Sequence, residues 1–340
     1  MNSGRLPLAA LLIALMIEPA VAQRKTRTPP ATPPQATTPA EPDVAYAEFQ
    51  RGNYVTSFKE AMRRVEEKSD PKAMTLLGEL YAGGFGVPND DAKAMEWYSL
   101  AAARGDREAM FAMAMFKMTG RGGPADRPEA ARLLGEAAKL GNVVANYDLA
   151  LLHLQGEIVA QDFTRSAELM RKAADAGSPE AQYALATFYK EGRGVPKDPQ
   201  EATRLLGIAA LSGHTAAEVE YGIAVFNGTG IAKNEAAAAS YFFKAAQRNN
   251  RVAQNRLAWM YATGRGLKAD PVEAGRWYLI AKAAGDNDQF LEDFASKMTP
   301  ADLAAAQTKA KPWIARMAPA DPASAQASAS APSGLAPAKP

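Results

Sequence analysis

Glycine recurs at a fixed spacing of 36 residues through the middle of this chain, and this regularity limits the folds open to it. The six positions are Gly84, Gly120, Gly156, Gly192, Gly228 and Gly264. A fixed period of this length, without insertions, is typical of proteins in which each structural unit packs only on its neighbours. The 340-residue chain is therefore predicted to form one repeat array, not the separate globular domains that its length alone would suggest.

Four further columns keep the same phase. Two hold alanine: Ala73, Ala109, Ala145, Ala181, Ala217 and Ala253, then Ala101, Ala137, Ala173, Ala209, Ala245 and Ala281. A third holds small residues: Gly78, Ala114, Ala150, Ala186, Gly222 and Ala258. A fourth holds bulky residues: Trp97, Leu133, Leu169, Leu205, Tyr241 and Trp277. The small columns predict close helix packing, and the bulky column is expected to fill the gaps beside them.

The unit at 178–213 shows what each repeat is expected to form. Apolar residues at the spacing of one helical face lead to Gly192, which is expected to end the first helix in a left-handed conformation. Asp198 then occupies an N-cap position before the second helix, which Gly213 ends. His214 begins the next unit, in a capping column with Asp106, Asn142, Ser178, Asn250 and Asp286. The predicted fold is all-α: a right-handed α-solenoid of helix-turn-helix repeats.

The array is expected to be closed at both ends. An N-terminal capping hairpin is predicted at 45–69, with breaks near Gly52-Asn53 and Ser69-Asp70, and C-terminal capping helices at 286–317. Thr299-Pro300-Ala301-Asp302 has the pattern of a capped helix start, and that helix is expected to run toward Lys311. The six repeats are placed at 70–105, 106–141, 142–177, 178–213, 214–249 and 250–285.

The N-terminus has the pattern of a secretory signal peptide at 1–22. Arg5 precedes an apolar run from Leu8 to Ile17, and Ala20-Val21-Ala22 forms a cleavage site, so cleavage is expected after Ala22. The alternative, a permanent anchor, needs about 20 apolar helical residues. We therefore expect a periplasmic or secreted protein without stable membrane insertion. Segments 23–44 and 318–340 are rich in Pro with Thr or Ser and are expected to be a disordered linker and tail.

Composition narrows the chemistry. The net charge of +2 does not favour nucleic acid as a partner, and the absence of cysteine excludes disulfides, thiolate metal sites and a cysteine nucleophile. The two histidines, His153 and His214, fall in different columns, the first with tyrosines and the second with capping residues. Glycine pairs such as Gly120-Arg121-Gly122 are predicted to be helix terminators, not phosphate loops. We predict no cofactor, metal or catalytic residues.

The repeat pattern A-x-x-x-L-A/G-x-x-Y-x-x-G-x-G-V-x-x-D, followed by A-x-x-W-Y-x-x-A-A-x-x-G, resembles the Sel-one-like repeat, a branch of the tetratricopeptide superfamily. The best matches are Ala73–Gly105, Ala181–Gly213 and Ala253–Gly285. Departures are Ile158 at a second glycine, Lys117 and His153 at the tyrosine, and Asn249 at a closing glycine. Asparagine tolerates the left-handed region, so the last change is expected to preserve the turn.

This resemblance implies an exported, non-enzymatic adaptor that mediates protein–protein interaction in the cell envelope, where such proteins regulate envelope signalling or exopolysaccharide production. The alternative is an envelope hydrolase acting on peptidoglycan or β-lactams. The branch of the family described with β-lactamase or penicillin-binding activity is rich in paired cysteines, and this chain has none. The resemblance therefore favours the scaffold over the hydrolase.

The same analogy places the first helix of each repeat on a binding face. Its outward positions form a candidate peptide-binding groove: Phe111, Met115, Met118, Tyr147, Leu151, Leu154, Tyr183, Val219, Ile223, Phe226 and Trp259. An apolar groove of this kind suits a peptide or helix of a partner protein, and methionine adapts to varied shapes. The alternative is that these side chains pack in the core between repeats.

A second candidate surface is a row of arginines in the glycine turns. Arg121, Arg193 and Arg265 lie 72 residues apart and are expected to align along one edge as a ridge for an anionic envelope polymer. The alternative is that these arginines are solvent-exposed residues of the turns with no binding role, and the sequence favours that interpretation.

Overall fold

A computed structural model describes residues 43–317, which form sixteen helices and no strand. The predicted all-α solenoid is confirmed. The expected signal peptide, nearly all of the linker and the expected tail lie outside the described residues, although Val44 already belongs to the first helix. Within the described range, no helix is both long and apolar enough to cross a membrane.

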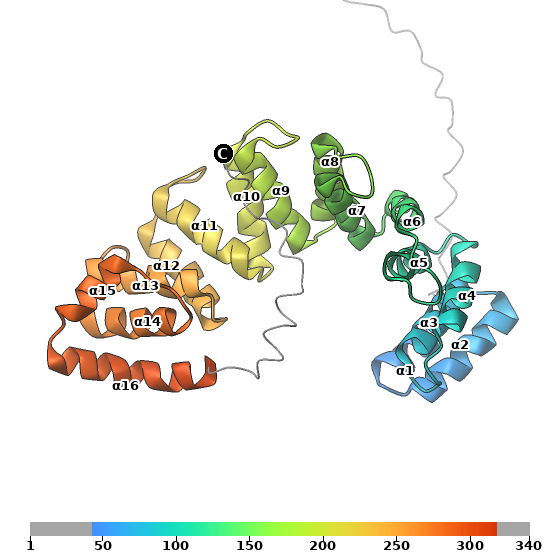
Figure 1. Ribbon diagram of the computed structural model, residues 1–340, viewed down its shortest axis with the longest axis horizontal. Coiled ribbons are helices and arrows are strands. Elements are labelled where there is room, and N and C mark those ends of the chain that lie inside the picture. The colour runs from blue at the N-terminus through green and yellow to red at the C-terminus, as the bar shows by residue number, and fades with distance from the viewer. Residues whose placement is uncertain (1–42, 318–340) are drawn as a thin grey trace, which may run out of the picture. The chain divides into compact units, whose positions relative to one another are not determined.

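Six helix pairs follow one another along the chain (Figure 1). The first helices of the pairs, called A helices, are α3 (Pro71–Gly83), α5 (Arg107–Thr119), α7 (Val143–Gln155), α9 (Pro179–Glu191), α11 (Thr215–Asn227) and α13 (Arg251–Thr263). The second helices, called B helices, are α4 (Asp91–Ala102), α6 (Arg127–Lys139), α8 (Phe163–Asp175), α10 (Pro199–Leu211), α12 (Glu235–Gln247) and α14 (Pro271–Ala283). Each B helix packs on its own A helix, and each of the first five also packs on the A helix of the next repeat.

Capping side chains set the helix starts where the sequence placed them. The Asp198 carboxylate accepts hydrogen bonds from the backbone N–H groups of Gln200 and Glu201, both at 3.0 Å, at the start of α10. At the start of α11 the cap is an imidazole, because Nδ1 of His214 accepts from the Ala217 N–H at 3.2 Å. Such bonds satisfy backbone donors that the first helical turn leaves without partners.

The expected capping role of Asp286 is wrong. Asp288 caps the next helix, α15 (Gln289–Ser296), by accepting from the Leu291 N–H at 3.1 Å. Asp286 instead accepts a hydrogen bond at 3.0 Å from the side-chain amide of Asn255 in α13. The cap of α15 therefore lies two residues later than the repeat pattern predicts.

The second glycine of each turn permits a close contact between repeats. Gly194 has φ +66°, and a Cβ there would lie 2.9 Å from the backbone N of Thr164, and closer still to the carbonyl group of Phe163, at the start of the preceding B helix. Gly230 and Gly266 meet the starts of α10 and α12 in the same way. Ile158 occupies the equivalent position in the third repeat, has no left-handed backbone, and packs against the core instead.

The core follows the columns seen in the sequence. Both alanine columns and the small column are buried throughout. In the bulky column Leu133, Leu169, Leu205 and Trp277 are buried, whereas Trp97 and Tyr241 are half-buried. Where the small column is glycine, an aromatic ring of the same repeat occupies the space, because a Cβ at Gly222 would lie 2.8 Å from the Phe242 ring.

Additional helices cover both ends of the array. Before the repeats, α1 (Val44–Gln50) and α2 (Tyr54–Lys68) form a hairpin, joined by a 2.8 Å hydrogen bond from the Ser57 hydroxyl to the Ala45 carbonyl. After them, α16 (Pro300–Met317) lies along α14 and is longer than expected, since it continues through Pro312. Its Trp313 ring meets the Trp277 ring edge-on at 5.6 Å between centroids.

Candidate binding surface

Several apolar side chains of the A helices are partly exposed to solvent and also pack against the core. Half-buried side chains at outward positions of α5, α7, α9, α11 and α13 are called the A-helix face: Phe111, Met115, Met118, Tyr147, Leu151, Leu154, Tyr183, Ile223, Phe226 and Trp259. Each also packs against a buried cluster. Each of these side chains is thus partly in the core and partly on the surface, so it has features of both the groove and the core interpretations.

Val219 is the exception among the predicted groove residues. Its side chain is 5% exposed and belongs to the buried cluster around α11 and α12, so it offers nothing to a partner. The structure also divides the remaining residues into two sets. Those of α5, α7 and α9 pack on one cluster, and those of α11 and α13 pack on another.

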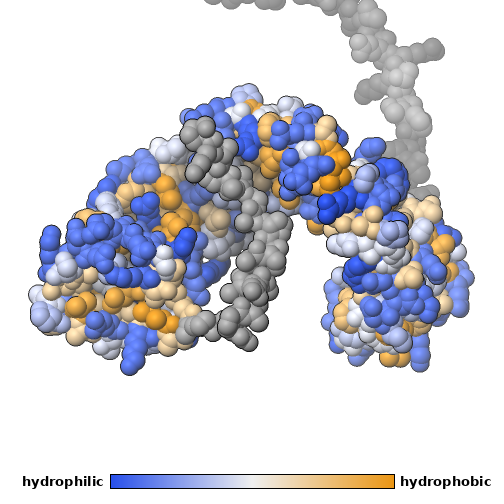
Figure 2. Space-filling view, viewed as in Figure 1, coloured by the Kyte–Doolittle hydropathy of each residue, from blue (hydrophilic) through white to orange (hydrophobic). Residues whose placement is uncertain are grey.

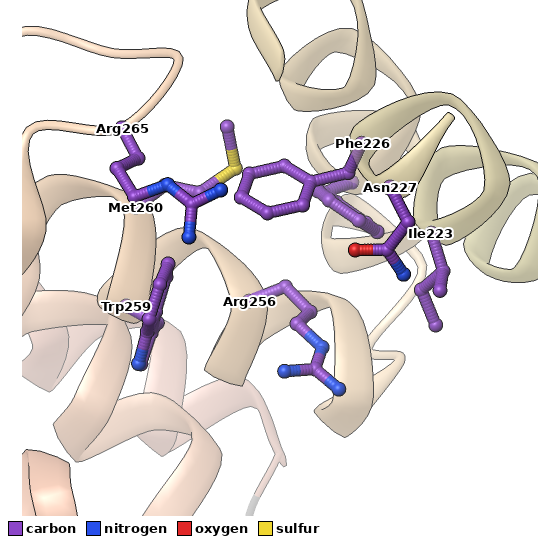
Figure 3. Close-up of a pocket in the computed structure, with 8 residues that line it drawn as sticks. Ile223, Phe226, Asn227, Arg256, Trp259, Met260 and Arg265 are labelled. Atoms are coloured by element: carbon purple, nitrogen blue, oxygen red, sulfur yellow. The ribbon is translucent and has the colours of Figure 1, made fainter. Parts of the chain in front are cut away.

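A cavity of about 250 Å³, called cavity I, lies between α11 and α13 (Figure 3). Figure 3 shows the rings of Phe226 and Trp259, the side chains of Ile223 and Asn227, and two guanidinium groups around one space. The complete lining is Ile223, Phe226, Asn227, Phe242, Arg256, Trp259, Met260 and Arg265. Cavity I therefore combines apolar walls with cationic and amide groups.

A second cavity of about 390 Å³, called cavity II, lies between α9, α10 and α11. It shares Ile223 with cavity I, so the two hollows flank the same A helix. Its remaining lining is Lys190, Lys197, Pro199, Ala202, Thr203, Leu206, Glu220, Ala224 and Thr229. Glu220 is already engaged, because it accepts from the Tyr183 hydroxyl at 2.8 Å and from Lys190 at 2.9 Å.

Sequence reasoning missed the polar residues of these cavities. Arg256 and Asn227 line cavity I and Lys197 lines cavity II, yet none was predicted as a site residue. One signal was present: Arg256 is the single cation in a column otherwise made of Leu76, Ala112, Asp148, Ala184 and Glu220. A cation in a column whose other charged members are acidic is the signal that could have pointed to this surface.

Asp148, on the A helix α7, is a charged residue without a partner among the described residues. It lies on α7 beside Tyr147, is half-buried, and forms no hydrogen bond or ion pair with any residue in the described range. Burial raises the pKa of the Asp148 carboxyl to about 6. Burial and the neighbouring Asp148 charge also raise the pKa of the Tyr147 hydroxyl.

The three turn arginines remain partly exposed, with side chains 37–45% accessible, and each is paired with a carboxylate. Arg121 donates to both carboxylate oxygens of Asp91, at 3.1 and 2.6 Å, and to the Ala82 carbonyl at 2.9 Å. Arg193 pairs with Glu191 at 2.9 Å. Arg265 pairs with Glu235 at the start of the preceding B helix. Their charges are balanced by carboxylates, and Arg121 and Arg265 each tie one repeat to the repeat before it.

Both histidines bind backbone groups near turns. Nδ1 of His153 lies 3.2 Å from the Ala160 carbonyl and donates to it, which holds the end of α7 to the following loop. The His214 ring caps α11 and stacks on the Tyr183 ring with centroids 4.7 Å apart. Burial lowers the pKa of His214. Both imidazoles therefore have structural roles in the turns.

The exposed sides of the B helices carry ion pairs as well as apolar side chains such as Leu211, which is 77% exposed. There, charges pair within one helix: Arg132 with Glu129 at 2.7 Å in α6, and Arg165 with Glu168 at 2.8 Å in α8. Figure 2 shows apolar patches reaching the surface between polar regions, among them one over α11. Apolar contact area is therefore concentrated on selected parts of the surface.

Sel1 repeat models match six consecutive segments of the chain: 71–106, 107–142, 143–178, 179–214, 215–250 and 251–286. The chain belongs to the Sel1 repeat family. Proteins built from Sel1 repeats typically act as scaffolds that bind other proteins. The resemblance found in the sequence is thereby confirmed, and these matched segments begin one residue later than the repeats defined by the glycine spacing.

Two solved structures share the fold. A Sel1 repeat protein from Oxalobacter formigenes is 24% identical and superposes with a TM-score of 0.58, covering 70% of this chain and 94% of its own. A protective antigen of uropathogenic Escherichia coli strains, described as displaying an SLR fold, is 25% identical with a TM-score of 0.53. That comparison covers 84% of this chain and 69% of the antigen.

Proposed function

We propose that this Sel1 repeat protein is a non-catalytic scaffold that binds a segment of a partner protein along its A-helix face. The observation that carries the proposal is the pair of cavities on either side of α11, which share Ile223 and are walled largely by apolar groups. Such hollows allow side chains of a partner to be buried without unfolding the repeats.

The half-buried state of the A-helix face supports this role. Side chains such as Leu151 and Trp259 already rest on the core, so binding would cover their remaining area at small entropic cost. Aromatic residues and methionine, both present on this face, are enriched at protein interfaces.

The place of action that we propose is the cell envelope, with regulation of envelope signalling or exopolysaccharide production as the biological role. Support comes from the N-terminal sequence, where a basic residue, a ten-residue apolar run and an Ala-Val-Ala site follow one another. Fractionation of the producing cell, with mass spectrometry of the chain, tests this. A mature N-terminus at Gln23 in the envelope fraction is expected, whereas a full-length cytoplasmic chain contradicts it.

Site-specific photocrosslinking tests the binding face itself. A photoreactive phenylalanine analogue is placed at Ile223 on the A-helix face or, as the control, at exposed Lys139 at the end of α6. Crosslinking in cells should yield a defined protein adduct from position 223 and none from position 139. An adduct from position 139 alone, or from neither position, would contradict the proposal.

A further inference from the structure

The charges in cavity I are not equivalent, because Arg265 already has a carboxylate. Nε of Arg265 lies 3.2 Å from Oε1 of Glu235, and the guanidinium lies over the rings of Phe226 and Trp259 at 4.7 and 5.3 Å. This pairing, together with Lys233, lowers the pKa of Glu235 to about 2. Arg265 is thus a wall of the cavity with its charge already balanced.

Arg256 lies on the same cavity without such a partner. Its exposed side chain forms no hydrogen bond or ion pair with any residue of the described segment. The exposed side-chain amide of Asn227, across the cavity on α11, is also without a hydrogen bond within residues 43–317. Figure 3 shows both groups beside the aromatic walls. Cavity I therefore holds one cation and one amide that have no partner among the described residues, next to apolar surface.

These features restrict what cavity I can take. Its volume of about 250 Å³ is below the range of about 300–1,000 Å³ that holds a drug-sized ligand, so it suits a single large side chain. A purely apolar partner would cover Arg256 and leave its charge desolvated and unpaired, which is costly. A cationic partner would be repelled. A carboxylate beside the apolar group satisfies the guanidinium with a charge-assisted hydrogen bond.

Cavity II repeats the combination on the other side of Ile223. Lys190 is paired with Glu220, but Lys197 forms no hydrogen bond or ion pair among the described residues. Apolar groups, including Leu206 and Ile223, line the same hollow. A segment that crosses α11 would therefore meet an apolar hollow with an unpaired cation on each side.

We propose that the partner segment carries an aromatic or large aliphatic side chain for cavity I, with the carboxylate of a neighbouring Asp or Glu bound by Arg256 and Asn227. This inference rests on the proposed function and names the chemistry of the partner. The carboxylate is a side-chain group in an internal segment, since cavity II offers the chain a continuation past Ile223.

Peptide selection with the purified chain tests the inference. Random twelve-residue peptides are displayed with their C-termini fused, so no free terminal carboxylate is present. Selected peptides should place Asp or Glu within two residues of an aromatic or large aliphatic residue. The strongest peptide is then made as a C-terminal amide, labelled, and its affinity is measured by fluorescence anisotropy.

Arg256→Gln should weaken this peptide at least tenfold. Arg251→Gln, a matched change of an exposed arginine on the same helix but outside cavity I, should leave the affinity within twofold. Replacing the peptide's acid by its amide should cost wild-type protein a similar factor and cost Arg256→Gln almost nothing further. That non-additivity is the signature of a direct pair.

The failures can be told apart. If peptides bind and Ile223→Gln abolishes binding, but Arg256→Gln and the acid-to-amide peptide behave as wild type, the carboxylate inference is wrong and the binding face stands. A preference confined to peptides with a free C-terminus would likewise overturn the internal-segment proposal. If the selected peptides bind regardless of Ile223→Gln, or no peptide is selected, the binding face and the inference both fail.

Discussion

Gly194→Ala isolates the contact that lets one repeat approach the next. Position 194 has φ +66°, and an added Cβ would clash with the backbone at Phe163 and Thr164. The matched control is Gly177→Ala, at φ +93° in the same part of the array, where an added Cβ meets nothing within 4 Å. Both changes force an alanine into a left-handed conformation, and only the first also crowds the preceding repeat.

The two contributions have separate magnitudes. A left-handed backbone costs an L-residue about 1–2 kcal/mol, which applies to both variants. Overpacking costs about 1–3 kcal/mol more, and it applies only at position 194, where the obstacle is backbone and cannot rotate away. We therefore expect Gly177→Ala to lower the free energy of unfolding by about 1–2 kcal/mol and Gly194→Ala by about 2–5 kcal/mol.

Urea unfolding followed by circular dichroism at 222 nm measures both. The comparison is direct when the variants share the dependence of free energy on urea concentration, and a shallower slope for Gly194→Ala would show that the repeats on either side have begun to unfold separately. Equal losses of stability in the two variants would refute the argument, because the inter-repeat contact would then contribute nothing.

Three further changes test other parts of the structure. Ala186→Leu enlarges a side chain that is 1% exposed and should lower the free energy of unfolding by about 1–3 kcal/mol, so an unchanged melting temperature would disprove the packing of the small column. The His214 cap needs a neutral Nδ1, and its pKa lies below the ordinary 6.5, so wild type should lose stability as pH falls from about 7 to 5. His214→Asn should remove most of that loss in melts across this range; parallel profiles would contradict it. The raised pKa of Asp148 acts in the opposite direction. Because ionisation of this carboxyl opposes folding, wild type should lose stability as the pH rises from about 4 to 6. Asp148→Asn should then gain about 1 kcal/mol at pH 7, after allowance for partial exposure, and almost nothing at pH 4.

The repeat fold could be predicted closely because each of its determinants is local. Gly192 stops a helix and Asp198 starts the next through backbone conformation and a hydrogen bond two or three residues away. Asn249, predicted to tolerate a left-handed turn, has φ 62°. Asp286 failed because its competitor, Asp288, lies two residues further on, and the choice depends on Asn255 in a different repeat.

The binding surface was less predictable because the exposure of a side chain depends on how neighbouring helices pack against its own helix. The spacing of Val219 is the same as that of Phe111 and Tyr147, and only the packing of α11 on α12 buries it. Arg265 looked available in the sequence, whereas its carboxylate partner, Glu235, lies 30 residues earlier. The free state of Arg256 has the same origin, since the absence of a partner is visible only when neighbouring helices are placed.

Helices in this protein pack mainly on those that precede and follow them in the chain, and this has a kinetic consequence. Folding that depends on local contacts is fast and can advance from the N-terminus as the chain is made. Until synthesis reaches the end, however, the newest repeat presents an uncovered apolar side. For the last repeat that side includes Trp277, which α16 covers with Trp313. Formation of α16 is thus the step that covers the apolar side of the last repeat, so that side stays exposed in a nascent chain until α16 has been made.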